Sequence, residues 1–190
     1  MRRQRTKCRG SLVNYFPEQH VRFEAKQPFT STKPKHMSKS ANITAPDPAQ
    51  RPPRSPRSRL GGYALLPRML DKGRATIAGK NGDYSYDSPF DQHVLKFAGI
   101  DPKKLLVELK KGKGDGEILD WINTNAKSKR RAREIQQWSD YQDRRGPDSD
   151  AETLKFFAGY LDKLTKTRED IRTWADALEL DDHCTFGGKA

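Results

Sequence analysis

Apolar residues recur at steps of three and four along much of residues 60–190, which is the spacing of one face of an α-helix. The clearest example lies in residues 60–91, where one predicted helix face carries Tyr63, Leu66, Leu70, Gly73 and Ile77. Pro67 has no backbone N–H and is tolerated only in a first turn, so this helix is expected to begin between Gly62 and Pro67. Gly79 is expected to end it.

More helices are predicted from the same spacing and from local start signals. Ser88-Pro89 and Asp101-Pro102 each supply a capping side chain followed by a proline at the first helical position. Further helices are expected to start near Asp115, Ser128, Ser149 and Thr167.

Between the first two predicted helices, Tyr84-Ser85-Tyr86 has the alternation of a strand, with both tyrosines on one side. The predicted fold is therefore all-α. It is an irregular bundle of about six to seven short helices, with one short extended segment or hairpin near residues 83–87.

Charge divides the chain into two parts. Residues 1–36 hold nine Lys and Arg against two Glu, and residues 37–60 hold five against one Asp, which leaves +1 of the total of +12 for residues 61–190. Residues 1–59 are predicted to be a disordered basic leader and linker, and residues 60–190 a single helical domain. The composition changes at Met37, which makes Met37 a candidate for the true start of the natural protein.

Composition also excludes some classes of protein. No apolar run approaches the roughly 20 residues that cross a bilayer, so a membrane protein is excluded. Cys8 and Cys184 are the only cysteines, which is too few for a disulfide framework or a zinc site and suits a cytoplasmic location. No cofactor or metal is predicted. His93 lies within a predicted helix, and His183 follows Asp181-Asp182 close to Cys184. Asp/His/Cys ligation of a metal can be imagined there, but an ordinary polar tail is favoured.

The first candidate site combines charged residues of the helix near Pro67 with the tyrosine segment after it. Such a set could bind an anion or a small polar molecule, since pockets often combine aromatic walls with convergent polar groups. Two structural alternatives remain open. The charged residues could form a solvated face with weak ion pairs, or the tyrosines could pack on the helix and hydrogen-bond to a carboxylate. The candidate ligand-binding residues are Arg68, Asp71, Lys72, Arg74, Tyr84, Tyr86 and Asp91.

The second candidate site is a basic cluster at the start of a predicted helix. Cations there oppose the helix dipole, and they could instead contact phosphates of a nucleic acid. Glu134, Asp140 and Asp143 follow on the same helix and the domain is almost neutral, so nucleic-acid binding by the folded part is not favoured. The candidate residues are Lys127, Lys129, Arg130, Arg131 and Arg133.

The run LPRMLDKGRA at residues 66–75 is the most specific part of a pattern that covers about Ser55 to Ala190. This pattern resembles a bacterial family catalogued as domain of unknown function 5069 (DUF5069). Many members are similar to a Y-x-Y-x-x-P-L-D pattern. Here Tyr84, Tyr86, Pro89 and Asp91 match that pattern, and Phe90 replaces the leucine. Members usually begin shortly before the LGGY segment, which is residues 60–63 here, and this is consistent with a start at Met37. The family has no established activity, so the resemblance implies no catalytic residue.

Residues 60–190 are therefore interpreted as a small ligand-binding or protein-interaction module whose partner is an unknown small molecule or protein. The alternative is a small enzyme that uses Arg68, Asp71, Tyr84 and Tyr86 for acid–base or anion chemistry. Nucleic-acid binding through residues 127–133 ranks third.

Overall fold

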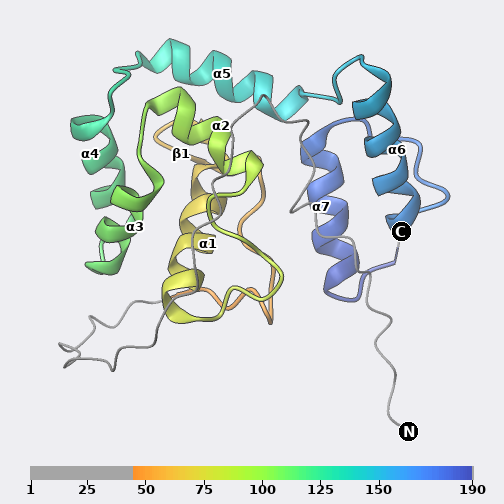
Figure 1. Ribbon diagram of the computed structural model, residues 1–190, viewed down its shortest axis with the longest axis horizontal. Coiled ribbons are helices and arrows are strands. Elements are labelled where there is room, and N and C mark those ends of the chain that lie inside the picture. The colour runs from red at the N-terminus through yellow and green to blue at the C-terminus, as the bar shows by residue number, and fades with distance from the viewer. Residues whose placement is uncertain (1–44, 190) are drawn as a thin grey trace, which may run out of the picture.

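The computed structural model describes residues 45–189, and within them it contains seven α-helices and one short hairpin (Figure 1). The predicted all-α class is confirmed. The candidate start at Met37 and most of the predicted leader lie outside the described residues. The elements are β1 (Arg59–Leu60), β2 (Tyr63–Ala64), α1 (Leu66–Ala78), α2 (Pro89–Ala98), α3 (Pro102–Lys110), α4 (Asp115–Asn125), α5 (Ala132–Arg144), α6 (Ala151–Leu164) and α7 (Trp174–Thr185).

The hairpin lies before α1 rather than at the predicted position near residues 83–87. β1 and β2 pair antiparallel, and the two glycines between them, Gly61 and Gly62, have φ values of 57° and 85°. A two-residue hairpin loop favours positive φ at both positions, which glycine adopts without strain. Residues 82–83 and 86–87 form turns instead, and the Tyr84-Ser85-Tyr86 segment has no partner strand among the described residues. Its backbone is held by Asn81, whose side-chain amide donates to the Tyr84 carbonyl at 3.0 Å.

The predicted starts of α2 and α3 are confirmed. Ser88 and Asp91 cap α2 reciprocally, and the Asp101 side chain accepts from the Lys104 N–H at 2.9 Å. The predicted start of the last helix at Thr167 is wrong. α7 begins at Trp174. Thr173, just before it, forms a capping box with Asp176, the third residue of the helix.

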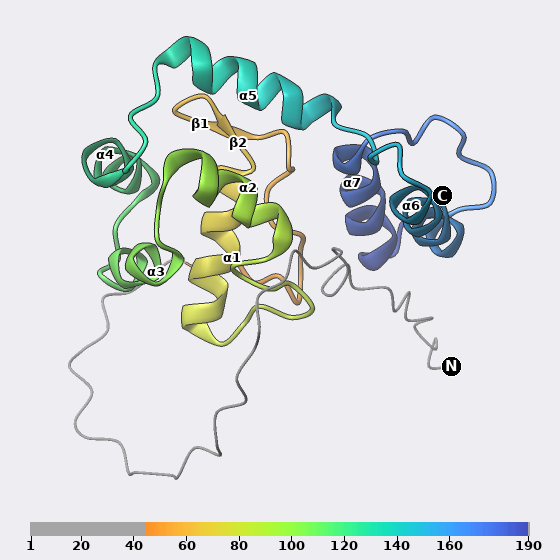
Figure 2. The same ribbon diagram turned by 45° about the horizontal axis from the view of Figure 1, so that its top comes forward.

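The larger of two hydrophobic cores surrounds α1. α1 contacts the hairpin, α2 and α3, while α4 and α5 complete the enclosure (Figure 2). Leu66 and Leu70 are fully buried, as the periodicity predicted. Because neighbours cover α1 on several sides, every residue from 66 to 75 is buried, including the four that carry charge.

The second core lies between α6 and α7. Its rings include Phe157, Tyr160 and Trp174, and Phe90 of α2 joins it with its ring centroid 5.9 Å from that of Trp174. α5 runs along the top of the molecule from the α4 side to the α7 side (Figure 1). The two cores therefore meet where α2 and α5 approach α7.

The described part of the predicted linker packs on the helices. Pro56 is fully buried and its carbonyl accepts from the Leu65 N–H at 2.9 Å. Arg54 and Arg57 form ion pairs with helix residues. The packed unit thus starts before the predicted boundary at residue 60. Each helix in residues 45–189 is too short or too polar to cross a membrane.

Candidate functional site

The four charged residues predicted on α1 are buried rather than solvated. Arg68 is 5% exposed, Asp71 7%, Lys72 5% and Arg74 9%. Isolated buried charges are costly, so each is expected to have a partner of opposite sign. The structure supplies such partners for all four, and this excludes the alternative of an exposed face with weak pairs.

Arg68 pairs with a carboxylate on the last helix. Its guanidinium donates to both oxygens of Asp182, at 2.7 and 2.9 Å, which is the bidentate geometry that favours arginine. The Tyr84 hydroxyl donates to the same carboxylate at 2.7 Å, and the guanidinium lies over the Tyr84 ring, 5.4 Å from its centroid. This trio therefore connects α1, the loop before α2, and α7.

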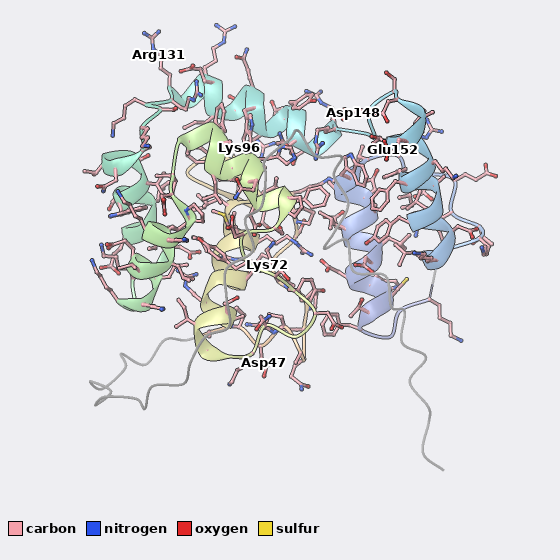
Figure 3. The ribbon with its side chains drawn as sticks, viewed as in Figure 1. Asp47, Lys72, Lys96, Arg131, Asp148 and Glu152 are labelled. Carbon is pink, nitrogen blue, oxygen red and sulfur yellow. The ribbon has the colours of Figure 1, made fainter. Side chains whose placement is uncertain are left out.

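Lys72 pairs with the cap of α2 in the interior (Figure 3). Its ammonium lies 2.7 Å from an Asp91 oxygen and 3.0 Å from the Ser88 hydroxyl. The other Asp91 oxygen accepts from the Ser88 N–H at 3.1 Å, so one carboxylate both caps α2 and neutralises the lysine. Burial lowers the pKa of the Lys72 ammonium, and the attraction of Asp91 works against that change.

Asp71 and Arg74 join a chain of charges that includes two residues the sequence analysis did not select. Arg54 donates to Asp71 at 2.8 Å and to Asp115 at 2.6 Å, and Arg74 donates to the other oxygen of Asp115 at 2.6 Å. Asp71 lies three residues from both Arg68 and Arg74 on α1, but its partner is Arg54, from the segment before β1.

The two tyrosines of the predicted site donate hydrogen bonds to different parts of the fold. The Tyr86 hydroxyl donates to the Pro102 carbonyl at 2.9 Å, away from Asp182. Its ring lies against Gly73, where an added Cβ would come within 3.2 Å of the ring and 2.7 Å of Leu109. Gly73 therefore allows both α3 and the tyrosine loop to approach α1 closely.

These contacts fill the predicted site with the protein's own side chains. Two cavities of about 10 Å³ each occur elsewhere, and none of the seven candidate residues lines either of them. The seven residues thus form a buried network that ties α1 to α2, α4, α7 and the segment before β1. Chemically, this arrangement holds the charges of α1 in fixed pairs with carboxylates or cations of other elements.

Two cations of the basic cluster donate hydrogen bonds to backbone carbonyls of the fold. The Lys129 ammonium donates to the Asn123 carbonyl and, at 2.7 Å, to the Thr124 carbonyl, at the end of α4. The Arg130 Nε donates to the Phe97 carbonyl at 3.0 Å, and its guanidinium lies 4.5 Å from the centroid of the Phe97 ring. The loop backbone also bonds to α2, because the N–H groups of residues 127 and 128 donate to carbonyls of residues 99 and 98.

Lys127, Arg131 and Arg133 are exposed and form no ion pair with any described residue. Lys96, near the end of α2, is also exposed, and Figure 3 shows Arg131 at the outer edge of the molecule. We call these exposed cations, together with the two bound ones, the basic surface: Lys96, Lys127, Lys129, Arg130, Arg131 and Arg133.

The histidines and the described cysteine do not converge. His93 Nε2 lies 3.1 Å from an Arg145 nitrogen, and burial together with Arg145 lowers the pKa of His93 to about 4. Cys184 Sγ lies 3.8 Å from the Leu164 carbonyl oxygen. Among residues 45–189, no group of three or more His, Cys, Asp and Glu side chains could hold a metal ion.

Arg54, Asp115 and Asp182 were missed because nothing local in the sequence marks them. Arg54 lies in a Pro- and Arg-rich stretch that reads as a linker, and Asp182 lies in a segment that reads as a polar tail. Each is identified only by its partner, which is 114 residues away in the case of Asp182 and Arg68.

Comparison with known proteins agrees with the resemblance carried by the LPRMLDKGRA run. No curated protein matches the sequence. A family described as domain of unknown function (DUF5069) matches residues 50–184, a range that includes Arg54, all of α1 and Asp182. The matched range also begins before the predicted domain boundary at residue 60, in keeping with the packing of residues 53–58. The chain therefore belongs to the DUF5069 family.

Proposed function

We propose that this chain is a protein-interaction module that binds an acidic segment of a partner protein through the basic surface. The observation that carries this proposal is the group of exposed, unpaired cations at Lys127, Arg131 and Arg133, beside Lys96. The buried charged side chains of residues 45–189, in contrast, all form ion pairs within the fold. Cations that lack an internal partner are the ones available to an external one.

The basic surface is also rigidly supported. Residues 127–130 are attached to α2 by backbone hydrogen bonds and by Arg130, which packs on Phe97. Phe97 in turn stacks on Trp138 of α5, with ring centroids 4.6 Å apart. A surface that is ordered before binding loses less conformational entropy when it binds.

A short acidic partner fits better than a long polyanion. The basic surface ends along α5 at Glu134, and Asp140 and Asp143 follow, where both pair with Arg59. An extended nucleic acid that followed α5 would meet these carboxylates. The net charge of +1 in residues 61–190 gives little long-range attraction for such a polymer.

Nucleic-acid phosphate is the second candidate, and one feature favours it. Arg131 and Arg133 lie at the N-terminus of α5, whose dipole adds to their positive potential. Helix N-termini with nearby cations are common contacts for phosphate.

A binding experiment distinguishes the acidic peptide from the nucleic acid as ligand. The probes are a labelled Glu-rich peptide and labelled single- and double-stranded DNA, measured by fluorescence anisotropy at about 50 and 200 mM salt. The test variant carries Arg131→Glu and Arg133→Glu. The matched control carries Lys103→Glu and Lys104→Glu, which make the same change of charge at exposed positions on α3.

We expect the peptide to bind the unmodified chain, and the test variant to bind it about tenfold or more weakly, because two attractions become repulsions. The control should bind as the unmodified chain does. Tighter binding of DNA than of peptide, with a steep loss at the higher salt, would favour the second candidate. Equal weakening in both variants would contradict a role for the basic surface.

We keep a cytoplasmic location as part of the proposal, because two cysteines in 190 residues suit a reducing compartment. The alternative of an enzyme that uses Arg68, Asp71, Tyr84 and Tyr86 has less support. Burial and the adjacent Asp182 raise the pKa of the Tyr84 hydroxyl, so this hydroxyl is a poor proton donor at neutral pH.

A further inference from the structure

Arg145, just after α5, differs from the other enclosed arginines. Arg54, Arg57, Arg68 and Arg74 each pair with a carboxylate. The Arg145 guanidinium is partly buried and forms no ion pair within residues 45–189, and its Nε is buried without an acceptor among those residues. A partly buried positive charge without a carboxylate is unusual, since such charges are normally paired.

Trp174, the first residue of α7, provides a second buried donor at the same place. It is 4% exposed, and its indole Nε1 also has no acceptor among the described residues. Its backbone N–H donates to the Arg145 carbonyl at 3.0 Å, so the two residues are directly joined. The start of α7 adds the positive end of a helix dipole at this point.

Both residues line one small cavity. The end of α5 lies beside α7 in this part of the molecule, as the two ribbons in Figure 1 show. The cavity has a volume of about 10 Å³, which is room for one water-sized particle. Phe90, Leu65 and Leu178 form much of its apolar wall. Asp143 is the one carboxylate in the lining, and it pairs with Arg59, which donates to it at 2.6 Å and is shared with Asp140.

The two unpartnered groups are both donors, and this selects the kind of occupant. Arginine has no acceptor, and the indole nitrogen only donates. A water molecule would accept from both and would then need acceptors for its own hydrogens, for which the side chains of the lining offer only the Gln142 carbonyl and the already paired Asp143 carboxylate. A monatomic anion only accepts, and it would also balance the charge of Arg145.

We propose that the cavity lined by Arg145 and Trp174 binds one monatomic anion of about the size of chloride. The anion accepts hydrogen bonds from the Arg145 Nε–H and the Trp174 Nε1–H. It neutralises the guanidinium where α2, α5 and α7 meet, and so stabilises the contact between the two cores.

Diffraction from crystals of the full chain grown in bromide tests the site directly. We expect an anomalous peak between Arg145 and Trp174, replaced by a non-anomalous density when bromide is exchanged for chloride. A water molecule at this position in bromide, or no density there, would overturn the proposal. This result does not depend on any variant and so remains decisive if a variant fails to fold.

Thermal unfolding provides a second readout, with chloride titrated against gluconate at constant ionic strength. The melting temperature of the unmodified chain should rise with chloride and saturate, because a ligand that binds only the folded state stabilises it. Arg145→Gln and Trp174→Phe should each weaken the apparent affinity for chloride about tenfold or more, since each removes a donor to an ion. Arg144→Gln is the matched control, because this neighbour is exposed and its Nε donates to the Asp140 carbonyl of its own helix. The same response to chloride in all four proteins would contradict the assignment.

Discussion

Lys72 and Asp91 form a buried ion pair whose net contribution to the stability of the fold is small, although the loss of either partner is costly. Their 2.7 Å pair is almost fully enclosed, and the desolvation of two charges offsets much of their attraction. Removing one partner of such a pair typically costs about 3–5 kcal/mol, because the other charge stays buried without compensation. The α1 network is therefore better understood as a determinant of which helices pack together than as a large net source of stability.

Asp181, next to Asp182 on α7, gives a prediction about pH. Burial raises the pKa of its carboxyl to about 6, above the ordinary value of 3.8. The folded state then binds more protons than the unfolded state between about pH 4 and 6, so this residue makes folding more favourable as pH falls through that window. Above pH 6 its charged carboxylate is a cost to the folded state.

Asp181→Asn removes that cost. The pKa difference corresponds to about 3 kcal/mol, and partial exposure reduces the expected gain at pH 7 to about 1 kcal/mol. Urea unfolding at pH 7, 5.5 and 4 should show the advantage of the variant shrinking towards zero at the lowest pH. His93, with its lowered pKa, has the opposite dependence, but it is common to both proteins and cancels in the difference. The exposed control Asp120→Asn should change little, and a variant advantage that grew on acidification would contradict the assignment.

At the scale of elements, one serine attaches the hairpin to α5. Ser139 is fully buried, and its hydroxyl accepts from the Ala64 N–H at 2.9 Å and donates to the Gly62 carbonyl at 2.7 Å. Two-residue strands cannot hold a hairpin in place by their own ladder. The Ser139 side chain on α5 therefore provides hydrogen bonds to the hairpin backbone, which a third strand would provide in a larger sheet.

Ser139→Ala should destabilise the fold by about 2 kcal/mol, because it leaves the buried Ala64 N–H without an acceptor and removes the donor to the Gly62 carbonyl. Chemical denaturation measures the change, and hydrogen exchange at the Ala64 amide should become faster. Ser149→Ala, at an exposed position before α6, is the control and should stay within about 0.5 kcal/mol of the parent. Unchanged protection of the Ala64 amide in the Ser139 variant would show that the hydroxyl does not hold the hairpin.

At the scale of the whole molecule, the segment before β1 connects helices that belong to both cores. Arg54 reaches Asp71 of α1 and Asp115 of α4, and Arg57 reaches Asp176 and Glu179 of α7. Since the hairpin is held by α5, residues 54–64 contact most of the helix layer. This arrangement explains why a stretch rich in Pro and Arg is part of the packed unit.

A chain of residues 60–190 should therefore be less stable than one of residues 45–190. Loss of Arg54 leaves Asp71 without its partner at a cost of about 3 kcal/mol, which corresponds to a fall of about 10 °C in the melting temperature for a chain of this size. Calorimetry measures the difference. Arg54→Met within residues 45–190 should reproduce a large part of it, and equal melting temperatures for the two chains would support a boundary at residue 60.

The sequence by itself determined the helical class, the buried apolar row of α1 and the starts of α2 and α3. These features depend on caps, prolines and spacings within about four residues, and such signals act locally. Only the tertiary structure decided which residue each buried charge pairs with and which strands pair. Arg68 could have met Asp71 three positions away but binds Asp182, 114 residues along the chain. The hairpin formed at Gly61-Gly62 rather than at the tyrosines, because a strand exists only where another strand and a packing surface meet it. The charged face of α1 became buried because helices from distant parts of the chain cover it, and that covering is a property of the whole fold.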